Sequence, residues 1–213
     1  MHFIGVLNTK GGTGKTTLAS CLAVRAARDT RVAVVDLDPQ GSLTDWYVRR
    51  GATDNPALMR GVEHASDAVT ALTRNCSYDF VFFDGPPGSI LVTEDAVRSS
   101  TLVVIPLRAS GLDLAASQDC ISLCQETGTP FLLVINAKGQ HDGRLVEEAC
   151  KLLSSWKLPF ARTTIASRLQ YVNAITTGRT GPEKDRKAEA EIDALWAEVK
   201  ATALRSAKRR ARA

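Results

Sequence analysis

A glycine- and lysine-rich run at residues 10–17 has the composition of a phosphate-binding loop. It reads Lys-Gly-Gly-Thr-Gly-Lys-Thr-Thr, follows an apolar run of strand length at residues 3–7, and leads into a helical pattern at residues 16–28. Glycines let the backbone curl so that successive N–H groups point inward, and the start of the following helix adds positive potential for an anion. We therefore predict a phosphate site at this point of the chain. Its residues are Gly11, Gly12, Thr13, Gly14, Lys15, Thr16 and Thr17.

Two side chains of this loop have the chemistry to act on a nucleotide. Lys15 is placed to reach the β- and γ-phosphates, and the Thr16 hydroxyl is placed to ligate Mg²⁺. The spacing departs from the pattern GxxxxGK followed by Ser or Thr at one position, because Thr9 stands where the first glycine belongs. A glycine-rich turn that merely caps a helix is the alternative. The Gly-Lys-Thr-Thr run that opens a helix directly after a strand argues against it.

Acidic residues stand at the ends of two further apolar runs. Asp36 is the last residue of the run at residues 32–36, and Asp38 lies two positions beyond it. Asp84 is the last residue of the run at residues 80–84. Ligands of open α/β sheets bind outside the carboxyl ends of the strands, so these carboxylates are expected to face the nucleotide. The form of the second run, four apolar residues and then an acid, suits a carboxylate that binds a Mg²⁺ water. A strand-end turn acid that caps the next helix is the alternative for Asp36 and Asp38, and for Asp36 the two interpretations are balanced. For Asp84 the alternative is a turn aspartate after a core strand.

The segment after residues 131–135 bears on the choice of base. A guanine-binding NKxD motif would need lysine at position 137 and aspartate at position 139, where this chain has Ala137 and Gly139. The sequence therefore favours ATP over GTP.

Short apolar runs alternate with helical patterns along the chain, which predicts a doubly wound α/β fold: a mostly parallel sheet flanked by helices on both faces. A short strand near residues 161–165, a helix over residues 169–177, a break at residues 178–182 and a last helix from about Glu183 are expected to follow. With no repeat or linker in the pattern, we expect one domain over residues 1–213. The other expected strands are residues 3–7, 32–36, 80–84, 102–106 and 131–135, and the other expected helices are residues 16–28, 67–74, 112–126 and 144–156.

Charge is unevenly distributed. The chain has 213 residues and a net charge of +4, yet residues 198–213 hold six basic residues and one acid, which leaves 21 basic and 22 acidic residues elsewhere.

The sequence also bears on the cellular compartment. No apolar run reaches the length of about 18 residues that a membrane span needs. The N-terminal run lacks the features of a secretory leader. The five cysteines lack metal-binding spacing and are expected to be buried apolar residues, so the sequence favours a cytoplasmic protein.

Residues 10–16 resemble the deviant Walker A motif, KGGxGKT, of the ParA/MinD family of ATPases, which have a P-loop NTPase fold. By itself Lys10 could equally be a solvated surface lysine. In the family the extra lysine crosses a nucleotide-sandwich dimer to touch the partner's phosphates, so the resemblance implies that Lys10 stabilises charge in trans. Positive charge beside the transferring phosphoryl group is what this kind of catalysis requires.

The same resemblance assigns further roles. The run Asp36-Leu37-Asp38-Pro39-Gln40 looks like the family's DxDPQ box, which implies that Asp38 positions the attacking water close to Mg²⁺ and that Asp36 orients the loop. Residues 85–88 are expected to form a switch that senses the γ-phosphate. Asn136 is expected to contact adenine, with a turn cap as the alternative. The implied catalytic residues are Lys10, Lys15 and Asp38, and the implied metal ligands are Thr16, Asp38 and Asp84.

Similarity to short plasmid-partition ParA proteins of the ParF type extends from Phe3 to about Leu204. It includes residues 42–46, 107–114 and 162–165, with Arg168 and Tyr171. Only nine residues precede Lys10, so the helix-turn-helix domain of long ParA proteins is not expected. Two departures stand out. The prolines that the ParF type has after its fourth strand are largely missing after Pro106, and the Pro-Arg pair that many members place beside the base is absent at residues 165–167.

The basic C-terminal end is the candidate DNA-binding segment. An apolar stripe at residues 192, 195, 196, 199 and 203 is expected to pack on the domain. Beyond Leu204 no apolar anchors are interleaved with the cations, which argues against a membrane helix. Dense positive charge neutralises phosphates with little reading of bases. A solvated tail is the alternative. The candidate DNA-binding residues are Arg205, Lys208, Arg209, Arg210 and Arg212.

The resemblance implies a Mg²⁺-dependent ATPase that forms a homodimer on ATP, binds DNA non-specifically on the nucleoid, and drives plasmid or chromosome partition. A ParB-like centromere-binding partner would stimulate slow hydrolysis. Two alternatives remain: a positioner of protein cargo that uses the nucleoid as its track, and a nucleotide-gated DNA-binding scaffold. Electron transfer of the nitrogenase-reductase kind is disfavoured, because the cysteines do not follow the strand ends.

Overall fold

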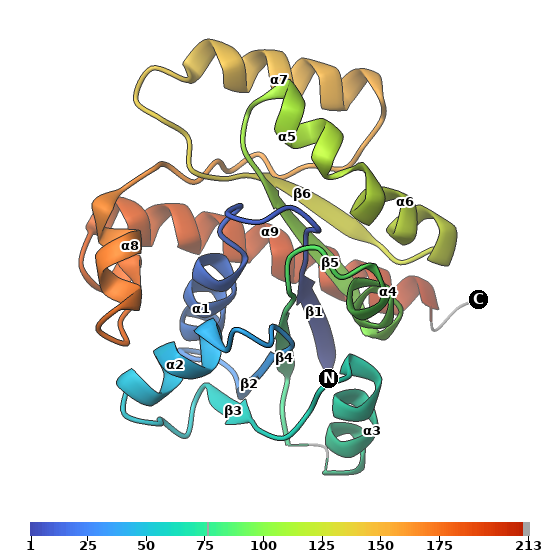
Figure 1. Cartoon of the computed structure of the whole chain (residues 1–213), viewed down its shortest axis with the longest axis vertical. Coiled ribbons are helices and arrows are strands. Elements are labelled where there is room, and N and C mark those ends of the chain that lie inside the picture. The colour runs from blue at the N-terminus through green and yellow to red at the C-terminus, as the bar shows by residue number, and fades with distance from the viewer. Residues whose placement is uncertain (76, 211–213) are drawn as a thin grey trace.

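The computed structural model describes residues 1–75 and 77–210, within which six strands form one parallel sheet. The strand order is β3-β2-β4-β1-β5-β6, and helices cover both faces (Figure 1). The doubly wound α/β fold predicted from the sequence is confirmed. The strands are β1 (His2–Val6), β2 (Val32–Asp36), β3 (Ala57–Met59), β4 (Phe80–Asp84), β5 (Leu102–Leu107) and β6 (Phe131–Ile135).

The helices fall into two layers. One layer consists of α1 (Lys15–Ala26), α2 (Ser42–Arg49), α8 (Leu169–Ile175) and α9 (Arg186–Arg210), with the short 3-10 helix η1 (Gly181–Glu183) before α9. The other consists of α3 (Ala65–Asn75), α4 (Ile90–Ser99), α5 (Gly111–Ala116), α6 (Gln118–Thr127) and α7 (Gly143–Ser155).

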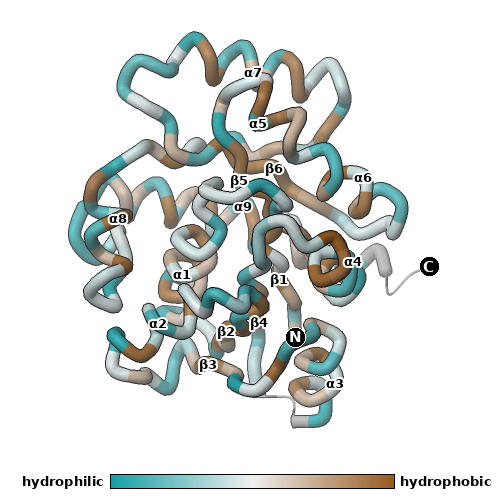
Figure 2. Tube along the Cα trace, in the orientation of Figure 1, coloured by the Kyte–Doolittle hydropathy of each residue, from teal (hydrophilic) through white to brown (hydrophobic). Residues whose placement is uncertain are grey.

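Alternate residues of each strand pack against opposite layers. On β4, Phe80 and Phe82 lie in the apolar cluster of α1 and α9, whereas Val81 and Phe83 lie in that of α3, α4 and α6. Figure 2 shows the apolar colour concentrated on the central strands and on the inward sides of the helices. Because both faces are buried, the strands are nearly continuous apolar runs.

The carboxyl ends of the strands position the site. Parallel pairing places Asp84 of β4 beside Val6 of β1 on one side and beside Asp36 of β2 on the other. The loops that follow these strands therefore leave the sheet at the same edge, which is where ligands bind in open α/β sheets.

Some expected boundaries are wrong. The single helix expected over residues 112–126 is two helices, α5 and α6, which meet at Ser117. This buried serine accepts a hydrogen bond from Asn8 Nδ2 (3.0 Å) and donates one to Asp113 O (2.8 Å), so the junction is held by polar contacts. The expected strand at residues 161–165 is an extended segment beside an isolated bridge between Leu133 and Phe160. Elements α2, β3 and α4 were not predicted, and α9 begins at Arg186, after η1.

Candidate nucleotide site

The loop between β1 and α1 has the backbone shape of a phosphate cradle. Gly12 and Gly14 have left-handed φ angles of 72° and 87°. A Cβ atom at Gly14 would lie 2.3 Å from Asn136 Nδ2, so only glycine fits there. Asn136, at the end of β6, donates a hydrogen bond from Nδ2 to Thr13 O (2.7 Å). In this structure Asn136 therefore holds the loop.

A residue that the sequence analysis missed fixes the start of this loop. Asn8 is almost fully buried and accepts a hydrogen bond from Lys10 N (2.9 Å) through Oδ1. Its Nδ2 donates to Pro106 O (2.8 Å) and to Ser117 Oγ (3.0 Å). Asn8 thus joins the loop to the end of β5 and to the junction of α5 and α6. These contacts couple segments about a hundred residues apart, which local spacing does not reveal.

Lys15 opens α1 inside the site. It is buried, with 7% of its surface exposed, and its Nζ donates to Lys10 O (3.1 Å). Burial lowers the pKa of Lys15, while the charges of Asp84 and Asp38 act in the opposite direction. A buried ammonium at the start of the helix that follows a glycine loop has the charge needed to bind a phosphate.

Asp84 is the most unusual group of the site. It is fully buried, and neither carboxylate oxygen has a well-formed hydrogen bond within the described residues, although the Thr16 hydroxyl lies near enough to lower its pKa. Burial raises its pKa to about 8, and Asp36 and Asp38 add to the shift, whereas the Thr16 hydroxyl and Lys15 oppose it. An unpartnered buried carboxylate is costly unless a cation or donor satisfies it. Asp84 and the Thr16 hydroxyl therefore fit a Mg²⁺ ion.

The remaining ligands of such an ion would come from outside this pair. Within the described residues no group of three or more His, Cys, Asp or Glu side chains is arranged to hold a metal. Mg²⁺ commonly keeps several waters and binds through one or two carboxylates together with substrate phosphates. A sparse set of protein donors is therefore compatible with a metal that is bound together with a nucleotide.

The two acids after β2 differ in their contacts. Asp36 accepts hydrogen bonds from Asp38 N (3.2 Å) and from Thr44 N (2.8 Å), so it organises the turn and the first residues of α2. Burial raises its pKa, against these hydrogen bonds. Asp38 is partly exposed, and its Oδ1 accepts from Gln40 N (3.0 Å). The helix-capping interpretation thus describes Asp36, whereas Asp38 remains accessible beside Asp84 and Lys15.

A cavity of about 210 Å³ lies beside the loop. Its walls include Thr17 and Leu18 of α1, Asn136, and Tyr171 of α8. The Tyr171 hydroxyl is buried without a partner in the described residues, and burial raises its pKa. The cavity is lined by both apolar and polar side chains and adjoins the glycine loop, which suits a base.

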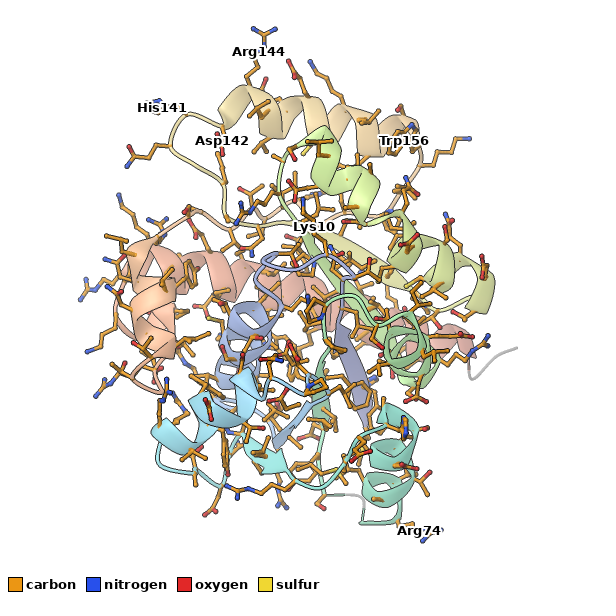
Figure 3. All side chains as sticks on the ribbon, in the orientation of Figure 1. Lys10, Arg74, His141, Asp142, Arg144 and Trp156 are labelled. Atoms are coloured by element: carbon orange, nitrogen blue, oxygen red, sulfur yellow. The ribbon has the colours of Figure 1, made fainter. Side chains whose placement is uncertain are left out.

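Lys10 points to a different part of the molecule. Its Nζ lies 2.6 Å from Asp113 Oδ1 of α5. Figure 3 shows Lys10 between the loop before α1 and the helices above it. The lysine predicted to act in trans is therefore bound within its own chain in this structure.

The predicted DNA-binding residues lie away from the loop. Arg205 and Lys208 are exposed near the end of α9, where the Arg205 guanidinium donates to Thr202 Oγ1 (3.0 Å). The backbones of Arg209 and Arg210 belong to α9, and Arg212 lies outside the described residues. The apolar stripe of α9 is buried, as predicted. No helix of the described residues is long and apolar enough to cross a membrane.

Strand, glycine loop and helix, with a buried lysine and an acid at a neighbouring strand end, define a P-loop nucleoside-triphosphate-binding protein. Residues 4–191 match the model of the CobQ/CobB/MinD/ParA nucleotide binding domain. This match covers most of the chain, which therefore belongs to that family, the ParA/MinD ATPases expected from the loop.

Two relatives and one solved structure show the range of similarity. The chain is 27% identical to the maintenance of carboxysome distribution protein A of Halothiobacillus neapolitanus, over 92% of this chain and 95% of that protein. It is 33% identical to the chromosome-partitioning ATPase Soj of Thermus thermophilus, over 50% of this chain and 54% of that protein. The putative plasmid partition protein of Borrelia burgdorferi bound to AMPPNP superposes with a TM-score of 0.75 at 17% identity, over 93% of this chain and 98% of that one.

Proposed function

We propose that the chain is a Mg²⁺-dependent ATPase that dimerises on ATP, binds non-specific DNA and thereby drives partition of a plasmid or chromosome. The observation that carries this proposal is the buried, unpartnered Asp84 carboxylate at the end of β4, close enough to the buried Lys15 of a deviant P-loop for the charge of each to shift the pKa of the other. The family, whose members are ATPases, supports hydrolysis of the bound nucleotide.

The residues divide the chemistry among them. The loop N–H groups and Lys15 would bind the β- and γ-phosphates, and Thr16 and Asp84 would hold Mg²⁺, with Asp38 close by. Bound Mg²⁺ neutralises phosphate charge. Asp38 is accessible and would orient a water in line with the γ-phosphoryl group. Asn136 and the 210 Å³ cavity would receive the adenine. Turnover would be slow until a ParB-like partner completes the site.

Two basic surfaces could bind DNA in such a protein. The first is the end of α9, with Arg205 and Lys208. The second lies at the other end of this helix, about 30 Å away, since 21 positions at about 1.5 Å each separate Lys187 from Lys208. There Arg179, Lys184, Arg186 and Lys187 are exposed and make no ion pair within the described residues.

The acids around the second surface are already paired. Glu183 binds Arg50, and Asp185 lies 3.8 Å from Arg168, so the four cations keep their charge for an outside partner. Arg168 also lines the cavity beside the loop. The end of α9 remains our primary assignment because its charge is densest in sequence, and the second surface is the alternative.

Positioning of a protein cargo on the nucleoid is the second candidate function. It is favoured by one observation: the relative from Halothiobacillus, named for maintaining carboxysome distribution, aligns over 95% of its length, whereas the partition ATPase from Thermus aligns over 54%. The ATPase would be the same in both cases, and only the partner would differ.

DNA binding in the presence and absence of ATP and Mg²⁺ tests the proposal. Wild-type protein should bind a random-sequence duplex with ATP, and binding should fall steeply with salt. Asp38→Ala should bind ATP and DNA but neither hydrolyse nor release them. Continued release of DNA without turnover would favour the nucleotide-gated scaffold, and a lack of ATP-dependent binding would contradict the proposal.

Two variants locate the DNA surface. Truncation after Leu204 should flatten the salt dependence, whereas the double substitution Arg186→Glu with Lys187→Glu serves as the matched change at the other end of α9. If only the double substitution changed the dependence of DNA affinity on salt concentration, the DNA site would be assigned to the start of α9 instead.

A further inference from the structure

The ion pair between Lys10 and Asp113 has a consequence for the trans-acting lysine. We propose that Asp113 is a positioning residue that keeps Lys10 in its own subunit until a second ATP-loaded subunit accepts it. This inference rests on the proposed function, because it requires that Lys10 act across a dimer. It adds a competing site for that lysine within the monomer.

The main chain of Lys10 contacts the nucleotide site, whereas its side chain contacts α5. Its carbonyl oxygen accepts the hydrogen bond from Lys15 Nζ (3.1 Å), while its own Nζ lies 2.6 Å from Asp113 Oδ1. The Lys10 side chain is 35% exposed and that of Asp113 is 11% exposed. The loop can therefore keep its shape while the lysine side chain exchanges partners.

Asp113 is held independently of Lys10. The Ser110 hydroxyl donates to Asp113 Oδ2, and Asp113 N donates back to Ser110 Oγ (3.1 Å), which caps α5. The Asp113 carbonyl accepts from Ser117 Oγ (2.8 Å), and Ser117 in turn is bound by Asn8. Because these contacts fix Asp113, the lysine is the member of the pair that can move.

The carboxylate also has a second cation nearby. Burial would raise the pKa of Asp113, but hydrogen bonds from Lys10 and Ser110, together with the charges of Lys10 and Arg108, lower it. Arg108 is exposed and donates to Gly12 O of the loop (3.3 Å). When Lys10 moves away, the positive charge of Arg108 still acts on Asp113, so the Asp113 carboxylate is not left without a nearby cation.

The consequence is a threshold for dimerisation. Each subunit must give up one ion pair before its lysine can reach the partner's phosphates, and a partly exposed pair is weak enough to break reversibly. Removing the charge of Asp113 should therefore favour the ATP-bound dimer, whereas a residue that only stabilised the fold would not.

Sedimentation velocity with ATP and Mg²⁺ over a series of protein concentrations tests this inference. Asp113→Asn should reach half-maximal dimer at a concentration about five-fold lower than wild type, and it should stay monomeric without nucleotide. Asp119→Asn, which changes an exposed acid on the neighbouring α6, is the matched control and should behave as wild type. Asp113→Glu keeps the charge and should reach half-maximal dimer at the wild-type concentration.

Combination with Lys10→Ala separates the outcomes. In that background Asp113→Asn should have no effect on dimerisation, because the lysine it restrains is gone. An unchanged or higher threshold for Asp113→Asn, or an equal shift in the Lys10→Ala background, would overturn the inference alone. Failure of the wild-type protein to dimerise with ATP would overturn it together with the proposed function.

Discussion

The two lysines of one loop occupy contrasting environments. Lys15 belongs to an inner site, made of Lys15, Thr16, Asp38 and Asp84, in which Lys15 and Asp84 are buried. Lys10 belongs to an outer rim, made of Lys10, Arg108 and Asp113, in which the Lys10 side chain is 35% exposed. The two lysines are five positions apart in the sequence, yet Lys15 is buried and the Lys10 side chain is partly exposed.

The difference shows how one loop can both bind a ligand and respond to a partner. In the inner site, burial leaves the Asp84 carboxylate unpartnered, so a bound cation would gain free energy by satisfying it. In the rim, the ion pair is satisfied but accessible, so it can be exchanged at small cost. We infer that the inner site sets affinity and that the rim sets the state of assembly.

Lys15→Ala should produce the largest effect and would define the inner site. Without the buried ammonium, ATP affinity should fall by about 100-fold or more, because a charge-assisted contact to phosphate is lost inside a buried site. Isothermal titration with ATP and Mg²⁺ measures this, with Lys187→Ala as a control at an exposed lysine. Retained affinity in Lys15→Ala would remove the phosphate-loop assignment.

Asp84→Asn should separate stability from function. Because burial raises the pKa of Asp84 to about 8, the metal-free folded protein must keep this carboxyl protonated near neutral pH, whereas the unfolded chain ionises it freely. The amide does not ionise, so the metal-free variant should gain about 2 kcal/mol in its free energy of unfolding at pH 7, while Mg²⁺-dependent hydrolysis is lost. Urea denaturation in EDTA, together with an ATPase assay, measures both quantities. Loss of stability in the metal-free variant would mean that the carboxylate is satisfied in the fold and would weaken the metal assignment.

The inner site could be predicted from the sequence because each of its parts is local. A glycine loop after an apolar strand, and an acid at the end of another, carry their meaning within a few residues. Parallel pairing then brings Asp84 beside Val6 without further information. The central strands could be predicted for the same reason, because strands buried on both faces are continuous apolar runs in the sequence.

The rim could not be predicted in the same way. Asn8 and Ser117 are 109 positions apart in the sequence, and their hydrogen bond lies at the junction of α5 and α6, which the helical pattern conceals. The α5/α6 junction is held by a polar contact between distant parts of the chain, which no local pattern encodes.

Two elements outside the rim were also missed. The strand β3 has only three residues, and α4 begins with the exposed Ile90 and Leu91, so neither has a clear periodic signal.

Mixed dimers test the central claim, that Lys10 completes the site of the other subunit. Lys10→Ala and Asp38→Ala are each expected to hydrolyse little ATP alone. Mixed in equal amounts, they should recover roughly a quarter of the wild-type rate, because half of the dimers are mixed and each has one complete site.

The complete site in such a dimer has its own Asp38 and receives Lys10 from the other subunit. If Lys10 acted within its own chain, no site in the mixture would hold both residues. An ATPase rate of the mixture equal to the sum of the two separate variants would therefore contradict the account.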